Sequence, residues 1–399
     1  MTAEARYDTI VVGAGPAGSL AAHDLAAAGA RVLLVDRAAF PRDKPCGGGV
    51  LIGAARHLPF SIEPVVERTL SDFRVRYRRD WTFEYHSDAP LVHMTRRARL
   101  DAYLAEQAVA AGATFQDDRR VRGVEPDAAH VTVRFEDGDA VSAATLVAAD
   151  GVNGVCRRAV GLPPLRAAVA MEADSPGVPG DWSRHVGIEL GSMPGGYGWV
   201  FPKGDHCNIG VGGWLGIGPR LRGELDAYGA MERFAAPELA GHRGYRLPLR
   251  DVGSPVVVGR VALVGDAAGL VDQLSGEGIG NAFRSGRMAA AAIARLLAGE
   301  AADLGGYQRA LEETIDADLA VSRQLYDLLH DHPWPYVQIM RRSGRFRRML
   351  CRLVRGETDY VHVRRRFGPL APCFDLAARR AARRVSQRRR RAGRRATVR

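Results

Sequence analysis

The sequence predicts an α/β fold in which a Rossmann-type domain carries an inserted mixed or antiparallel sheet and a set of C-terminal helices. Three observations predict it. An apolar run at Tyr7–Val12 leads into a glycine-rich turn, and the next apolar run ends on Asp36. Aromatic and β-branched residues are frequent in Val186–Gly213, as is typical of antiparallel strands. Residues 306–355 carry apolar side chains at helical spacing.

The first glycine-rich turn has the strand–turn–helix–strand context of a dinucleotide site. Gly13 allows the tight turn, Gly15 lets the backbone approach a pyrophosphate, and Gly18 lets helix and strand pack closely. The N–H groups at the helix start face the phosphate charge, and Asp36 can accept hydrogen bonds from the ribose of an adenosine. An ordinary glycine turn would leave Asp36 unexplained. This stretch alone does not separate FAD from NAD.

A loop with three successive glycines, Phe40–Gly49, follows Asp36. Pro41 and Pro45 stiffen this loop, while the glycines let its backbone come very close to another group. Chain order places the loop beside the ribose end of the cofactor. We therefore favour a cofactor contact over a plain surface loop.

A second glycine-rich unit comes much later in the chain. A buried strand ends on Gly265-Asp266, and the glycines of Gly276–Gly280 precede a predicted helix over residues 282–297. Asp266 can bind a ribityl hydroxyl, and the N–H groups of the helix start can face the flavin C2 oxygen. Because NAD has no ribityl chain, two such units favour FAD as the cofactor.

Three further features allow two interpretations each. Arg97 begins a helix, where it can meet a phosphate or a flavin edge or remain solvated. Asp150 ends a strand, where the backbone can approach a ligand or simply turn. Tyr197, Trp199 and Phe201 alternate along one strand, so they share a sheet face that is either core or the wall of an apolar pocket. The residues alone favour core.

The composition argues against several classes of protein. No apolar run approaches the ~20 residues that span a bilayer, and the chain enters its first strand too early for a signal peptide. The five cysteines form no Cys-x-x-Cys pair, and His330 and His332 follow no ligand spacing. We therefore predict neither a disulfide framework nor a metal site, and we expect a reducing, cytoplasmic location.

The net charge of +11 is concentrated at the C-terminus, because residues 379–399 contain 11 arginines and no acids. We expect residues 378–399 to form a disordered tail. An anionic membrane surface can hold such a tail, which would make the protein peripheral at the inner face of the membrane. Nucleic-acid binding is disfavoured, because no aromatic residues interleave with the arginines.

The ordered motifs resemble the geranylgeranyl reductase family, whose members are flavoproteins with the fold of para-hydroxybenzoate hydroxylase. The similar stretches cover most of residues 7–370 and are Phe40–Gly49, Tyr197–Lys203, Gly265–Gly269 with Gly276–Ile279, and, more weakly, Arg97–Asp101, Asp150-Gly151 and Arg355–Tyr360. The FAD contacts implied by the resemblance are Ala17, Asp36, Cys46, Gly47, Gly49, Arg97, Val121, Asp266, Gly278 and Ile279.

The resemblance also implies an activity. Members of the family reduce carbon–carbon double bonds in isoprenoid chains, with electrons from NAD(P)H or a ferredoxin-like donor. It makes Tyr197, Trp199 and Phe201 the wall of a substrate pocket over the flavin, which reverses the interpretation as core. The helices of residues 306–355 would then either roof an apolar tunnel or simply pack on the other domains.

The chain departs from the family pattern at two places. Asp272-Gln273 stands where Asn-Pro is usual, in a segment expected against the flavin ring. Gly154 stands where many relatives have serine, which weakens the Asp150-Gly151 motif as a binding site for a nicotinamide donor.

We expect three segments to build the FAD-binding domain, and two to build the substrate domain. The predicted boundaries are 1–72, 92–160 and 251–300 for the FAD-binding domain, 73–91 and 161–250 for the substrate domain, 301–377 for the C-terminal helices and 378–399 for the tail.

The predicted reaction is hydride delivery from the reduced flavin N5 to an alkene, with a proton supplied to the other carbon. Cys46, Tyr197 and Lys203 are the candidate proton sources. An aromatic hydroxylase and a flavin-dependent halogenase on the same fold are the alternatives, together with a non-catalytic flavin-binding scaffold. A halogenase needs an active-site lysine, and the chain has only Lys44 and Lys203. A prenyl lipid, a quinone side chain, a pigment tail and a polyene all fit as substrates.

Overall fold

A computed structural model describes residues 7–232, 234 and 239–396. Its largest sheet has eight strands in the order β17-β18-β11-β1-β2-β8, with β10 paired to β11 and β9 to β10. The strands are β1 (Tyr7–Val12), β2 (Val32–Val35), β8 (Thr114–Gln116), β9 (Val121–Pro126), β10 (Val131–Phe135), β11 (Ala140–Ala148), β17 (Val257–Val258) and β18 (Val261–Leu263).

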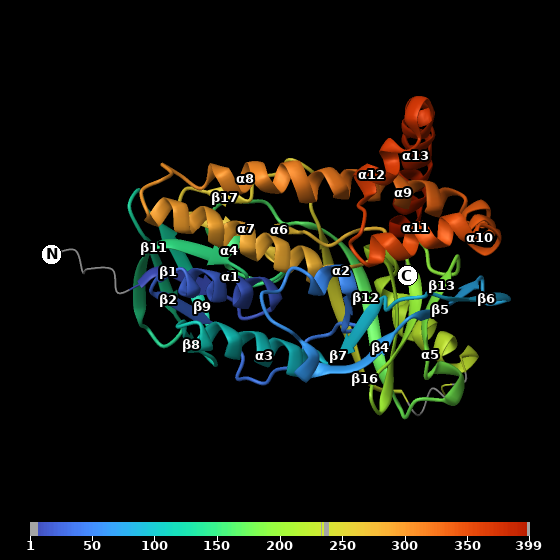
Figure 1. The fold of residues 1–399 in the computed structure, drawn as a ribbon, viewed down its shortest axis with the longest axis horizontal. Helices are drawn as coiled ribbons and strands as arrows, with labels where there is room; N and C mark the ends of the chain where they lie inside the picture. The colour runs from blue at the N-terminus through green and yellow to red at the C-terminus, as the bar shows by residue number, and fades with distance from the viewer. Residues whose placement is uncertain (1–6, 233, 235–238, 397–399) are drawn as a thin grey trace.

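The centre of this sheet is parallel and buried on both faces. β1 pairs in parallel with β2 and β11, and β11 pairs in parallel with β18. Side chains such as Ile10, Leu33 and Leu146 are fully buried in one core with those of the flanking helices. Near-continuous apolar strands covered by helices are the expected pattern for such a sheet. The covering helices are α1 (Pro16–Ala27), α3 (Arg97–Ala110), α7 (Ile279–Leu297) and α8 (Gly305–Leu311) (Figure 1).

A second sheet has seven strands in the order β16-β12-β15-β14-β13-β5-β6 and lies at the other end of the molecule (Figure 1). The strands are β5 (Asp72–Tyr77), β6 (Trp81–His86), β12 (Arg166–Pro176), β13 (His185–Leu190), β14 (Tyr197–Pro202), β15 (His206–Trp214) and β16 (Ala240–Leu249). All pairings are antiparallel except β13 with β5. The strands expected around residues 73–85 thus join the same sheet as those of 186–213. Helix α5 (Leu221–Met231) packs on β12 and β15.

Short elements connect the two large sheets. A three-stranded sheet contains β3 (Gly49–Leu51), β4 (Val66–Leu70) and β7 (Val92–Thr95). The remaining short helices are α2 (Ile52–Ala55), α4 (Cys156–Ala159), α6 (Gly265–Ala268), the 3-10 helices Glu63–Val65, Gly180–Trp182, Leu215–Arg220 and Gly368–Leu370, and a π-helical turn at Glu312–Asp316.

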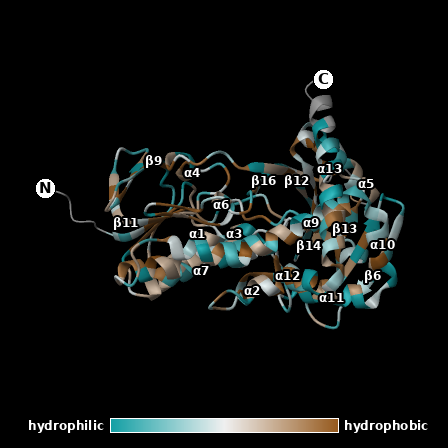
Figure 2. Ribbon diagram, turned by 90° about the horizontal axis from the view of Figure 1, so that it is seen from above, coloured by the Kyte–Doolittle hydropathy of each residue, from teal (hydrophilic) through white to brown (hydrophobic). Residues whose placement is uncertain are grey.

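The C-terminal helices lie at the end of the molecule opposite the N-terminus, as Figures 1 and 2 both show. They are α9 (Ala317–Asp331), α10 (Pro333–Arg342), α11 (Gly344–Val354), α12 (Tyr360–Arg365) and α13 (Ala371–Ala396). No helix within the described residues is long and apolar enough to cross a membrane.

The expectation of a disordered tail over residues 378–399 is wrong for residues 378–396, because α13 continues to Ala396, while residues 397–399 lie outside the described part of the chain. Ala378, Ala381 and Val385 recur on one face of α13 and are buried, and α13 packs against α9 and the Leu215–Arg220 turn. Arg384 also pairs with the buried Asp331. The charge run hid this apolar stripe, since small side chains at helical spacing add little to the overall hydropathy.

Candidate cofactor and active site

The first glycine turn is fitted to a close approach of backbone segments. Gly13 has a φ of +104°, and a Cβ atom there would lie 2.3 Å from the Ala149 carbonyl oxygen. A Cβ atom on Gly18 would lie 1.9 Å from the Gly13 carbonyl oxygen. Asp36 is buried and accepts a hydrogen bond from the Ala14 N–H at 2.9 Å. The turn, the helix and the terminal carboxylate predicted from the sequence therefore form one unit.

The start of α1 offers a site for a pyrophosphate. Its N-cap is Gly15, which has no side chain that could cap the helix, and the first N–H groups of a helix have no partner within the helix. The Arg42 guanidinium lies 3.6 Å from the position of a Cβ atom on Gly15 and pairs with Asp36 and Asp101 at 3.5 and 2.9 Å. A cation beside a helix start suits a diphosphate. Arg42 lies inside the loop predicted to contact the cofactor, but it was not among the predicted site residues.

Arg97 is a buried ion-pair residue rather than a solvated one. Its guanidinium donates to both carboxylate oxygens of Asp101, at 2.8 and 2.7 Å. Burial alone would lower the pKa of Arg97, but Asp101 and the neighbouring Cys46 side chain raise it. Arg97 therefore keeps a permanent positive charge beside Cys46.

The second glycine-rich unit, which starts at Gly265, packs against the first one, which contains Gly13, Gly15 and Gly18. A Cβ atom on Gly265 would lie 3.0 Å from the Cβ of Ala17, so the starts of α6 and α1 pack together. Asp266 accepts from Lys44 at 3.0 Å and from the Tyr245 hydroxyl at 3.2 Å. Burial would raise the pKa of Asp266, but Lys44 lowers it, so this carboxyl is ionised at neutral pH. An ionised acceptor suits a ribityl hydroxyl.

Helix α7 begins beside this acid, with Gly278 as N-cap and Ile279 as first residue. The Glu277 carboxylate accepts from the Gly280 N–H at 2.5 Å, and burial raises its pKa to about 7. Val121 lies further along, at the start of β9, two residues after Arg119, whose N–H donates to the Asp36 carbonyl. Gly49 begins β3.

Asp150 has a local structural partner. Its carboxylate accepts from the Cys156 N–H at 2.9 Å, which fixes the turn before α4. Its other oxygen is buried and makes no hydrogen bond within the described part of the chain. Burial raises the pKa of Asp150.

The three aromatic residues of β14 form a continuous wall. The ring centroids of Tyr197 and Trp199 are 6.1 Å apart, and those of Trp199 and Phe201 are 6.2 Å apart. A Cβ atom on Gly47 would lie 2.6 Å from Phe201, and one on Gly276 would lie 2.6 Å from the Tyr197 hydroxyl. The wall therefore extends from the loop Phe40–Gly49, at Phe201, to the glycine-rich loop Gly276–Gly280, at Tyr197.

The candidate proton sources have different surroundings. The Cys46 thiol is half-buried and accepts from the Gly48 N–H at 3.4 Å. The Lys203 ammonium is buried and donates to the Gly47 and Thr95 carbonyls, and burial lowers its pKa to about 8. The Tyr197 hydroxyl donates to the Ser275 carbonyl. Burial raises the pKa of Tyr197. Two of the three groups are thus held by backbone carbonyls.

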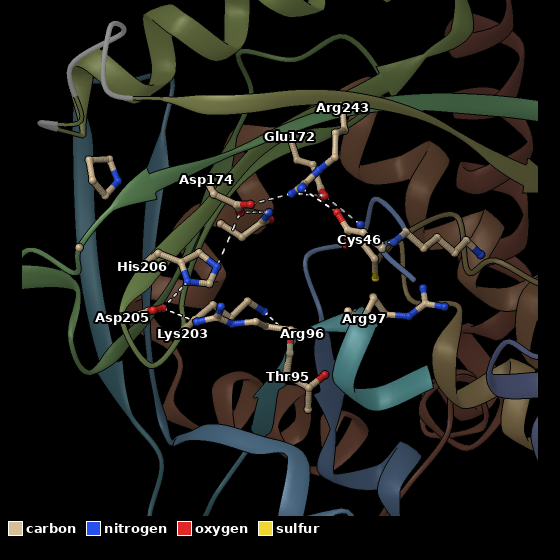
Figure 3. Close-up of a pocket in the computed structure, with 16 residues that line it drawn as sticks. Cys46, Thr95, Arg96, Arg97, Glu172, Asp174, Lys203, Asp205, His206 and Arg243 are labelled. Atoms are coloured by element: carbon tan, nitrogen blue, oxygen red, sulfur yellow. Dashed lines mark hydrogen bonds and ion pairs between the residues drawn. The ribbon is translucent and has the colours of Figure 1, made fainter. Parts of the chain in front are cut away.

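A charged cavity of about 500 Å³ adjoins Cys46 (Figure 3). Glu172, which was not among the predicted site residues, is 4% exposed and accepts from the Cys46 N–H at 3.0 Å. Burial raises its pKa to about 7, although Arg243, 3.4 Å away, opposes this shift. Glu172 can therefore hold a proton near neutral pH. The sequence does contain a signal for this residue, because Glu172 and Asp174 are acidic residues at alternate positions of β12 and therefore share one face of the sheet.

A chain of hydrogen bonds links the aromatic wall to the cofactor loop. Asn208 accepts from the Trp199 indole N–H and donates to Asp174, both at 2.9 Å. Arg243 donates to Asp174 at 2.7 Å and to Asp43 of the loop at 2.8 Å. The strands that carry these residues are neighbours in the sheet, in the order β16-β12-β15-β14.

Asp272-Gln273, which stands where the family usually has Asn-Pro, connects the loop before Gly276 to the C-terminal helices. Asp272 is buried and accepts from the Tyr360 hydroxyl at 2.9 Å and from Ser322 of α9. Gln273 accepts from Arg323 of α9 at 2.8 Å. The acid is therefore well partnered, and it fixes the segment that precedes Gly276.

One group of potential metal ligands occurs among the described residues. Glu67, Asp205 and His206 bring ligand atoms within 4.8 Å of one another. The Arg96 guanidinium pairs with Glu67 at 2.6 Å and with Asp205, so it already supplies their countercharge.

Comparison with known proteins agrees with this geometry. Residues 6–182 match the family model described as FAD binding domain. The chain is 34% identical to a geranylgeranyl diphosphate reductase of Rhodobacter capsulatus, over 75% of this chain and 78% of the relative. It is 33% identical to a menaquinone reductase of Mycolicibacterium smegmatis, over 71% of this chain and 76% of the relative.

Solved structures give the same picture. A geranylgeranyl bacteriochlorophyll reductase-like protein from Thermoplasma acidophilum superposes with a TM-score of 0.75 at 25% identity, covering 81% of this chain and 87% of that one. A flavin-dependent brominase also reaches 0.75, at 20% identity, covering 95% and 99%, and shows the shared fold alone. The chain belongs to the geranylgeranyl reductase family of FAD-dependent oxidoreductases.

Proposed function

We propose that this oxidoreductase reduces carbon–carbon double bonds in an isoprenoid or polyene substrate. The observation that carries the proposal is the aromatic wall, whose ends adjoin Gly47 and Gly276, one in each cofactor loop. An apolar chain lying against this wall would sit beside the cofactor. Relatives named geranylgeranyl diphosphate reductase and menaquinone reductase support the same substrate class.

FAD, when bound, supplies the electron pair as a hydride from its reduced ring. The helix starts at Gly15 and Gly278, with Asp36 and Asp266, would hold it. Tyr197, Trp199 and Phe201 would orient the alkene and exclude water, since an isoprenoid offers few polar groups for recognition.

We infer that Cys46 donates the proton to the second alkene carbon. Its thiol is the least restrained of the three candidates, because Lys203 and Tyr197 are bound to backbone carbonyls. Lys203 would act as a positioning residue that fixes Gly47. Glu172, beside Cys46 and next to the cavity, would supply protons from solvent.

We further propose that NAD(P)H or a ferredoxin-like protein supplies the electrons. We also propose that the enzyme meets its apolar substrate at an anionic membrane surface, held there through its Arg-rich C-terminal segment.

A halogenase has less support, because Lys44 pairs with Asp266 and Lys203 with two carbonyls.

Product mass tests the function. The FAD-loaded chain, reduced by dithionite without oxygen, is incubated with geranylgeranyl diphosphate and, separately, with menaquinone. We expect a product heavier by two hydrogens for each double bond reduced; menaquinone products are reoxidised in air before weighing, because dithionite also adds two hydrogens to the quinone ring. Products that contain an added oxygen or halogen atom, formed only with oxygen present, would favour the hydroxylase or halogenase instead.

A further inference from the structure

Charge is distributed very unevenly along this chain. Residues 333–399 contain 21 arginines and three acids, so they carry +18, whereas residues 1–332 carry −7. The positive segment is much longer than the final charge run. It includes α10 to α13, which lie in the half of the molecule opposite the N-terminus (Figures 1 and 2).

Exposed apolar side chains are concentrated in the same segment. Nine large apolar side chains are strongly exposed within the described residues, and five of them lie between residues 334 and 376. They are Trp334, Ile339, Phe367, Leu370 and Leu376. Leu370 is the most exposed of the nine, at 62%. Apolar exposure and positive charge thus coincide.

The two properties meet most closely at the corner between α12 and α13, which we call the 365–370 corner. All six of its residues, Arg365-Arg366-Phe367-Gly368-Pro369-Leu370, are exposed. Phe367 stacks on Phe374 of α13 at 4.9 Å between ring centroids. Arg379 and Arg380 are also exposed and lie further along α13. The corner therefore presents two apolar side chains next to a cluster of arginines.

We propose that the 365–370 corner docks on an anionic lipid bilayer, with Phe367 and Leu370 in the acyl boundary and the surrounding arginines at the headgroups. Arginines near a membrane are attracted by anionic lipid, and apolar side chains gain from leaving water. A nucleic acid would use the charge but would leave Leu370 in water. The proposal rests on the proposed function, since an isoprenoid substrate would reside in that bilayer.

This places docking on a corner held by packed helices rather than on a loose tail. Arg364 of α12 pairs with Asp375 of α13, and Arg384 of α13 pairs with Asp331 of α9. Tyr360 of α12 bonds to Asp272 in the segment that precedes Gly276. The corner is thus connected through well-partnered side chains to the loop beside the cofactor.

Vesicle sedimentation tests the proposal with the FAD-loaded full chain. The vesicles are phosphatidylcholine alone or phosphatidylcholine with phosphatidylglycerol, and contain no isoprenoid. We expect binding at least tenfold tighter to the anionic vesicles. The double variant Phe367→Ser with Leu370→Ser, and the double variant Arg365→Glu with Arg366→Glu, should each weaken binding at least tenfold.

Matched controls come from exposed residues elsewhere. Val252→Ser with Leu297→Ser removes two apolar side chains that are 53% and 37% exposed, against 40% and 62% for Phe367 and Leu370, and Arg120→Glu with Arg122→Glu reverses two exposed charges. Both should bind within twofold of the wild type. Equal binding to the two vesicle types, an unchanged serine variant, or a control that loses as much as the corner variants would each overturn the proposal. A serine variant that keeps its affinity while the glutamate variant loses it would indicate a purely electrostatic partner.

The result is independent of turnover. If the chain binds anionic vesicles through the corner but reduces no double bond, the docking surface stands and the proposed function fails. If it reduces geranylgeranyl diphosphate in detergent but ignores vesicles, the function stands and the docking surface fails.

Discussion

The indole N–H of Trp199 donates a hydrogen bond to the side-chain oxygen of Asn208 at 2.9 Å. Asn208 is 3% exposed, and its side-chain amide donates a hydrogen bond to Asp174. Arg243 donates to the same Asp174 carboxylate and also to Asp43, which lies in the loop Phe40–Gly49. Neither the Trp199 ring nor the Asn208 side chain can rotate without breaking the buried hydrogen bond between them. The centre of the aromatic wall is therefore oriented by the same polar chain that holds the cofactor loop.

Replacing Asn208 with leucine should loosen this wall. The change leaves the Trp199 N–H and an Asp174 oxygen without their partner, which costs about 1–3 kcal/mol of unfolding free energy. Denaturant unfolding measures this loss. We also expect the KM for geranylgeranyl diphosphate to rise while the affinity for FAD stays within twofold. A variant as stable as the wild type, with unchanged KM, would show that the indole is held by packing alone.

Cys46→Ser should keep FAD bound but slow turnover by about tenfold to a thousandfold, because the hydroxyl is a much weaker acid than the thiol. Steady-state reduction of geranylgeranyl diphosphate measures the effect. The control is Cys373→Ser, since Cys373 is an exposed thiol and its loss should change nothing. Full activity in the Cys46 variant would remove this residue from the mechanism.

Asp266→Ala should weaken FAD binding by roughly ten- to a hundredfold, as expected for the loss of one hydrogen bond to a charged group, about 1.5–3 kcal/mol. A fluorescence titration of the apo-protein with FAD measures the dissociation constant. Asp139→Ala removes an exposed carboxylate paired with Arg119 and serves as the control. An unchanged dissociation constant in the Asp266 variant would argue against the ribityl contact.

The folded protein should lose stability as pH rises through the titration of Glu172. Burial raises the folded pKa of this carboxyl to about 7, whereas the unfolded group ionises at its ordinary, lower pKa. Between these values the folded state binds more protons, so stability falls with rising pH. Glu172→Gln removes this contribution, which we expect to be about 1–3 kcal/mol.

Unfolding of wild type and Glu172→Gln should be compared in mildly acidic and mildly alkaline buffer. Glu277 and Lys203 titrate in the same range and remain in both proteins, so the difference reports on Glu172 together with its coupling to Lys203. We expect the glutamine variant to lose less stability on going to alkaline pH. Identical losses in the two proteins would mean that Glu172 is ionised throughout. Glu125→Gln, at an exposed pair with Arg134, should behave like the wild type.

The sequence was sufficient for the parts of the site that depend on local backbone requirements. Gly13, Gly18 and Asp36 lie where strand, turn and helix geometry dictates, so their spacing predicts their arrangement. The aromatic alternation in β14 predicted the shared face of the wall, and the proposal that this face lines a substrate pocket comes from the family resemblance.

The polar half of the site could not be predicted in this way. Glu172, Asn208 and Arg243 meet because four strands, far apart in the chain, are neighbours in one sheet. Arg42 was missed because its partners, Asp36 and Asp101, come from other segments. The helix at residues 378–396 was missed because a count of charges does not register the stripe of Ala378, Ala381 and Val385.

We propose that a bound, reduced FAD delivers its electrons to an isoprenoid double bond beneath the aromatic wall. Single-turnover reoxidation tests it most directly: the FAD-loaded chain is reduced without oxygen, mixed with geranylgeranyl diphosphate or menaquinone, and followed by flavin absorbance. We predict that at least one of these acceptors returns the yellow colour and gains two hydrogens in its isoprenoid chain, measured by mass after any quinol is reoxidised in air, and that Trp199→Ala slows this return at least tenfold. A flavin that stays reduced with both acceptors and reoxidises only when oxygen is admitted would contradict the account.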